Sequence, residues 1–212
     1  MKSIYRVIVE LQHEFNKKIS VDYLDKNFNW NSAIIAESGE LLDSLGFKWW
    51  KHQEPDIENV KVEAIDLLHF VISEYIQIYS QFYSIGKSID ETVEDFESYF
   101  TEKSLYDDFS QKNIDKLIDY LNYDQYGRFF IMKQIFKFLD MSNEEVYISY
   151  ITKNCLNKFR QDNGYKKGTY DKYWNEKEDN VVAFEVAKGI GAKDSLFEEL
   201  YSSLEFIYET RQ

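Results

Sequence analysis

Two stretches, AIIAESGELLDSLGFKWWK (residues 33–51) and NVKVEAIDLLHFVIS (residues 59–73), decide how this chain folds. Their apolar residues recur at intervals of three and four, which is the period of an amphipathic helix. Gly46 is expected to end the first helix, and Pro55 and Asp56 to begin the second, because each residue type is favoured at that helix end. The connection between them is short, so the two helices are expected to pack antiparallel.

The same apolar spacing extends over most of the chain. Further helices are expected over 4–15, 113–122, 125–139, 143–160 and 194–208, an acidic helix-compatible stretch over 86–112, and a loop over 161–180. One proline and eight glycines are too few for the many turns of an all-β fold. The expected fold class is therefore all-α, with a helical core over 1–83 and 113–212, an acidic helical insertion over 84–112 and a closing C-terminal segment.

Composition excludes several classes of protein. A net charge of −13 is unsuited to general nucleic-acid binding, which needs a surplus of lysine and arginine. A single cysteine excludes a disulfide framework and fits a reducing compartment. No apolar run is long enough to span a membrane, and the first residues do not resemble a signal peptide. We therefore expect a cytoplasmic, intracellular protein that binds neither nucleic acid nor membrane.

Two pairs of acidic residues lie on the two deciding helices: Glu37-x-x-Glu40 and Glu63-x-x-Asp66. Residues three apart share one helix face, so each pair presents two carboxylates to the same side. Packed antiparallel, the helices would bring four carboxylates together among apolar residues, where only a cation could offset their repulsion. All-oxygen ligation of this kind suits Mg²⁺, with Mn²⁺ as the alternative. The competing interpretation is that the carboxylates are ordinary solvated charges.

A basic segment, KNCLNKFRQDNGYKKGTYDKYWNEK (153–177), contrasts with the rest of this acidic chain. It holds seven lysines and arginines against three acidic residues, and its glycines allow close approach of a backbone to a ligand. Such a segment suits a phosphorylated substrate beside a metal site. The alternative is an electrostatic brace against the acidic remainder.

Together, the two helical stretches and the basic segment resemble the dimeric, all-α dUTPase family, relatives of the MazG-type nucleotide pyrophosphohydrolases. The resemblance is carried by residues 33–51, 59–73 and 153–180, which include E-x-x-E-L-x-D-S, F-K-W-W-K, E-x-x-D-x-x-H-F and a closing E-D-N. It implies a homodimer that hydrolyses dUTP, and also dUDP, to dUMP with Mg²⁺, which limits uracil incorporation into DNA. Attack of water on the β-phosphorus belongs to the same implication.

The resemblance also implies roles for individual residues. Glu37, Glu40, Glu63 and Asp66 would hold Mg²⁺, and Glu37 would orient and deprotonate the attacking water. The remaining candidates would bind substrate: Gln12, His13 and Asn16 at uracil, Trp49, His69 and Phe70 at the nucleoside, Lys51 close by, Lys153, Asn157, Arg160, Tyr165 and Lys172 at base or phosphates, and Asn180 near the metals. The common form of the family has glutamine where His13 stands.

Two other functions remain open at this point. One is a dCTP or broad-range nucleoside triphosphate pyrophosphohydrolase with the same metal site and another base pocket. The other is a non-catalytic helical binding protein on this fold, against which the basic segment argues.

Overall fold

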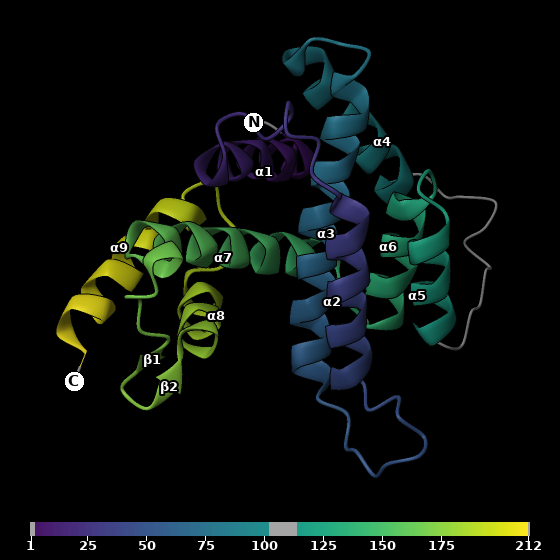
Figure 1. Ribbon diagram of the computed structural model, residues 1–212. Coiled ribbons are helices and arrows are strands. Elements are labelled where there is room, and N and C mark those ends of the chain that lie inside the picture. The colour runs from purple at the N-terminus through teal and green to yellow at the C-terminus, as the bar shows by residue number, and fades with distance from the viewer. Residues whose placement is uncertain (1–2, 102–113, 212) are drawn as a thin grey trace. The chain divides into compact units, whose positions relative to one another are not determined.

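The computed structural model describes residues 3–101 and 114–211, and these residues are mainly helical (Figure 1). The expectation of an all-α fold is confirmed, since one short hairpin is the only sheet in the part of the chain that is described. The chain divides into two compact units, residues 1–142 and 143–212. None of the helices described there is both long and apolar enough to span a lipid bilayer.

The first unit is built around one long, buried helix. Its helices are α1 (Ile4–Ile19), α2 (Trp30–Ser44), α3 (Ile57–Ser80), α4 (Ile85–Thr101), α5 (Ile114–Tyr123) and α6 (Arg128–Phe138). Helix α3 is apolar around much of its circumference, and α1, α2, α4 and α6 all pack against it. Helices α2 and α3 lie side by side and antiparallel, as the sequence predicts (Figure 1).

The two central helices begin at side-chain caps. The Asp56 carboxylate accepts a hydrogen bond from the backbone N–H of Asn59 at 3.0 Å, so α3 begins where the sequence predicts. The cap of α2 is Asn29, whose side chain accepts a hydrogen bond from the backbone N–H of Ser32 at 3.1 Å.

The acidic stretch after α3 is helical as far as it is described. Helix α4 buries Val93, Phe96 and Phe100 against the first unit, and the Phe96 ring stacks on Phe129 of α6 at 4.9 Å. The remaining predicted part, 102–112, lies outside the described residues. The division into a core and an insertion over 84–112 stays a prediction.

The second unit contains α7 (Asn143–Asp162), a 3₁₀ turn η1 (Tyr165–Lys167), the hairpin strands β1 (Tyr173–Trp174) and β2 (Lys177–Glu178), α8 (Asp179–Ile190) and α9 (Leu196–Thr210). Helices α7, α8 and α9 pack on one another around buried Cys155, Leu156 and Leu200. The apolar spacing of the sequence predicts no helix at α8.

Aromatic packing fixes the predicted loop of the second unit. The Phe159 ring of α7 makes edge contacts with Trp174 at 5.6 Å and with Tyr208 of α9 at 5.4 Å. Tyr170 stacks on Tyr208 at 5.3 Å between ring centroids. These contacts hold the segment between α7 and α8 against its own unit, although the segment has little regular structure.

Candidate functional site

Three of the four predicted metal ligands come together in the first unit. One carboxylate oxygen from each of Glu37, Glu63 and Asp66 lies within 4.8 Å of the others. Glu37 comes from α2, whereas Glu63 and Asp66 come from α3, so the antiparallel pairing of these helices creates the cluster. Glu40 is exposed and lies outside this group.

Asn59, one helical turn before Glu63, supports the cluster. Its side-chain amide donates to Glu63 Oε1 at 3.1 Å and to the Ser44 hydroxyl at 2.7 Å. Glu63 is only 9 % exposed, so this bond orients a buried carboxylate. Such partners of metal ligands commonly fix the direction in which the ligand atoms point.

The cluster fits a small divalent cation. Oxygens that surround one Mg²⁺ at about 2.1 Å lie no more than about 4.2 Å apart, so the three carboxylates need only a slight closure. All three donors are hard carboxylate oxygens, and with water and phosphate oxygens they could complete an octahedral shell. The same three charges without a cation repel one another.

The amides predicted to recognise uracil form a buried cluster where α1 meets α3. Gln12 and Asn16 are 3 % and 5 % exposed, and the Gln12 amide donates to Asn16 Oδ1 at 2.9 Å. The ring Nδ1 of His69 lies 2.6 Å from Gln12 Oε1. The structure therefore brings together three of the predicted substrate residues: Gln12, Asn16 and His69.

His13 points in a different direction. Its Nδ1 lies 2.7 Å from the hydroxyl of the buried Tyr23. Burial, the largest cause, lowers the pKa of His13, and Lys17 acts in the same direction against the charge of Glu14. His13 is therefore held as a neutral ring at neutral pH.

The predicted nucleoside wall is only partly assembled. The Phe70 ring lies 6.2 Å from that of Trp30, between centroids. Trp49, predicted to share this wall, is 89 % exposed in the connection between α2 and α3, where Lys51 is exposed as well. The aromatic residue next to Phe70 is thus Trp30, which the sequence analysis does not single out.

The basic segment of the second unit centres on an ion pair that the sequence analysis does not predict. Arg160 donates to both carboxylate oxygens of fully buried Asp179, at 2.8 and 2.7 Å, and Tyr170 donates to the same carboxylate at 2.8 Å. Burial lowers the pKa of Arg160, but the hydrogen bonds and charge of Asp179 more than offset it and raise the pKa overall. This bidentate pair joins α7 to the beginning of α8.

The other predicted phosphate contacts surround Arg160. Its guanidinium donates to the side-chain oxygens of Asn157 and Asn180, each at 3.3 Å. The Tyr165 ring lies 5.8 Å from the guanidinium and 5.4 Å from the Lys172 ammonium. Lys153 is buried within α7. Five of the six predicted residues of this segment are therefore neighbours: Asn157, Arg160, Tyr165, Lys172 and Asn180.

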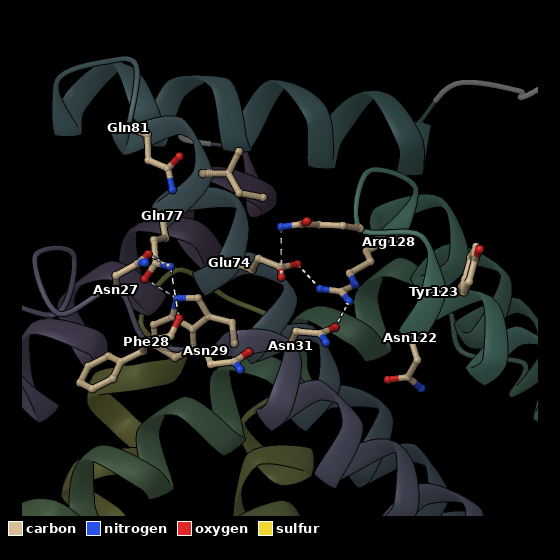
Figure 2. Close-up of a pocket in the computed structure, with 13 residues that line it drawn as sticks. Asn27, Phe28, Asn29, Asn31, Glu74, Gln77, Gln81, Asn122, Tyr123 and Arg128 are labelled. Carbon is tan, nitrogen blue, oxygen red and sulfur yellow. Dashed lines mark hydrogen bonds and ion pairs between the residues drawn. The ribbon is translucent and has the colours of Figure 1, made fainter.

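A pocket of about 580 Å³ opens at the N-terminal end of α2, lined by residues 27–31 and by parts of α3 and 122–128 (Figure 2). Buried Arg128 lines the pocket, where it ion-pairs with Glu74 and donates to Asn31. Gln77 accepts from the Trp30 indole at 2.8 Å. Because these polar groups pair with one another, the pocket wall primarily ties α2, α3 and α6 together.

Three supporting residues carry only weak signals in the sequence. Asn59 lies four residues before Glu63, and Ser73, whose hydroxyl accepts hydrogen bonds from the Gln12 and Asn16 amides, lies four residues after His69. This spacing places each pair on one helix face but does not identify a role. Asp179 belongs to the E-D-N word, yet nothing in that word shows that it pairs with Arg160.

Comparison with known proteins gives one family match. The dUTPase family model matches residues 4–165. That range includes all three clustered carboxylates, the amides of α1 and the first part of the basic segment, residues 153–165. No curated protein matches the chain. The family match covers well over half of the 212 residues, and the chain belongs to the dUTPase family.

Proposed function

We propose that this dUTP diphosphatase hydrolyses dUTP with a divalent cation, Mg²⁺ or alternatively Mn²⁺, held by Glu37, Glu63 and Asp66. Hydrolysis of dUTP itself follows from the family. The observation that carries the metal proposal is the convergence of three carboxylates from two helices within 4.8 Å. A cation at this position would offset the repulsion among the three carboxylates and between them and a triphosphate. Glu40 is proposed as a further ligand from its place in the E-x-x-E word.

The cation would polarise the phosphate oxygens and offset their charge. Glu37 would orient a water molecule and accept its proton. That water would attack the β-phosphorus, and the bond from this phosphorus to the oxygen bridging to the α-phosphorus would break. The products are dUMP, which keeps the bridging oxygen, and pyrophosphate. The same reaction on dUDP would give dUMP and phosphate.

The remaining residues are proposed to hold the substrate. The amides of Gln12 and Asn16 suit uracil, which offers two carbonyl acceptors on either side of an N–H donor. The basic segment is proposed to bind phosphates, with Arg160 held in place by Asp179. Following the family resemblance, we also propose a cytoplasmic homodimer.

Replacing Glu37 with glutamine tests the proposal, because the variant keeps the shape of the side chain and removes its charge. We expect turnover of dUTP to fall at least about 100-fold, equivalent to about 2.7 kcal/mol in the barrier. Glu58→Gln is the matched control, since Glu58 lies 87 % exposed on α3 beside Lys61. Wild-type activity should also disappear in EDTA and return with Mg²⁺. Full turnover by Glu37→Gln, or by the wild type in EDTA, would refute the mechanism.

A further inference from the structure

Ser73, in the middle of α3, lies at the centre of the amide cluster. Its side chain is completely buried, and its hydroxyl contacts both Gln12 and Asn16 of α1. A buried hydroxyl without hydrogen bonds is costly, and these contacts offset the cost of burying Ser73. The mechanism proposed above gives Ser73 no part.

The hydrogen-bond capacity of this hydroxyl is fully used. A serine hydroxyl has one proton to donate and two lone pairs to accept with. The proton goes to the backbone carbonyl of His69 at 2.8 Å, a shorter contact than the 3.4 Å to Asn16 Oδ1. Both lone pairs then accept, from Gln12 Nε2 and from Asn16 Nδ2, each at 3.0 Å.

This arrangement fixes which way each amide faces. The nitrogens of Gln12 and Asn16 must both point to Ser73, because a carbonyl oxygen there would face an oxygen that has no proton left to give. The oxygen of Gln12 must then point to His69, where Nδ1 lies 2.6 Å away and donates. The oxygen of Asn16 in turn accepts from Gln12 at 2.9 Å.

We propose that Ser73 is a specificity-determining position: by fixing the orientation of the Gln12 and Asn16 amides, it makes the base pocket select uracil over cytosine. The proposal rests on the base-binding role given to these amides above. Uracil presents an N–H and a carbonyl where cytosine presents a bare nitrogen and an amino group. An amide that can rotate by half a turn serves either base, whereas a fixed amide leaves unpaired groups against the wrong one. Ser73 is thus a positioning residue that acts through its neighbours.

The test compares kcat/KM for dUTP and for dCTP in the same enzyme preparation. We expect Ser73→Ala to lower the dUTP-to-dCTP ratio at least about 10-fold, chiefly through a higher KM for dUTP. The ratio is the informative quantity, because a loss of folded enzyme lowers both values equally. Ser88→Ala is the matched control, since Ser88 is also fully buried and donates to the carbonyl four residues earlier, at 2.9 Å, on α4.

Two further variants make each outcome decisive. Ser73→Cys, which keeps a group of similar size but accepts hydrogen bonds only weakly, replaces Ser73→Ala if that variant does not fold. Asn16→Ala removes one of the amides itself. If the ratio falls for Asn16→Ala but stays within about 2-fold of wild type for the Ser73 variants, the role of Ser73 is refuted and the base site stands. If it is unchanged for both, the proposed base site fails as well.

Discussion

Replacing Glu63 with glutamine should make the metal-free protein more stable while removing its response to Mg²⁺. Glu63 is 9 % exposed, and its carboxylate is grouped within 4.8 Å with those of Glu37 and Asp66. At an effective dielectric constant of about 20, two unit charges at this distance repel by about 3.5 kcal/mol. The substitution removes two such pairs.

The measured gain should be smaller than that sum. Glu37 and Asp66 are half-buried, so water and salt screen their charges. Glutamine keeps an oxygen that can accept from Asn59, which limits any loss at that bond. We expect a net gain of about 1–2 kcal/mol, or about 2–8 °C in the melting temperature for a chain of this size.

Magnesium should make the wild type more stable than Glu63→Gln, which is the reverse of the order expected in EDTA. A ligand that binds only the folded state stabilises by about 2.7 kcal/mol at a concentration 100 times its dissociation constant. The wild type should therefore melt several degrees higher in Mg²⁺ than in EDTA. Glu63→Gln lacks one of three clustered ligands and should show little or no shift at the same Mg²⁺ concentration.

The assay is thermal unfolding followed by circular dichroism, in EDTA and in millimolar MgCl₂ at constant ionic strength. Glu58→Gln serves as the control on the same helix and should retain the wild-type response to Mg²⁺. If Glu63→Gln is no more stable than wild type in EDTA and still responds fully to Mg²⁺, the carboxylates are not a cation site and the reasoning is wrong.

Three other predictions concern stability and reactivity. Asp179→Ala should destabilise the second unit by about 3–5 kcal/mol in a denaturant titration, because Arg160 is left buried without this carboxylate. The control is Glu185→Ala, which removes the exposed ion pair with Lys177 and should cost less than about 1 kcal/mol. Burial lowers the pKa of His13 below its unfolded value of about 6.5, so its contribution to stability is complete above pH 6.5 and is lost progressively as the pH falls below that value through the lower pKa of the folded state. The wild type should therefore lose more stability than His13→Gln between pH 7.5 and 5.5, and parallel curves would contradict this. Burial raises the pKa of Cys155 to about 12, so iodoacetamide at pH 8 should label it only after unfolding in urea, and rapid labelling of the native protein would show the thiol to be accessible.

The sequence by itself determined where most helices lie and that each acidic motif, Glu37-x-x-Glu40 and Glu63-x-x-Asp66, places two carboxylates on one helix face. Apolar spacing is a local property that survives into the fold, so helices α1 to α7 and α9 lie where the pattern predicts, to within a few residues and as far as they are described. Helix α8 was not predicted, although it is no shorter than α5; its first residue, Asp179, is held by a contact with Arg160 that the local pattern does not show.

Only the tertiary structure decided which predicted side chains meet. Four carboxylates share the spacing of ligands, but the packing of α2 against α3 brings together Glu37, Glu63 and Asp66 and leaves Glu40 exposed. The bonds of Ser73 likewise join residues 57 positions apart in the chain. Helical periodicity indicates which face of a helix a residue occupies. The distance between atoms on two helices depends instead on how those helices pack, and that packing follows from the whole core rather than from any local sequence motif.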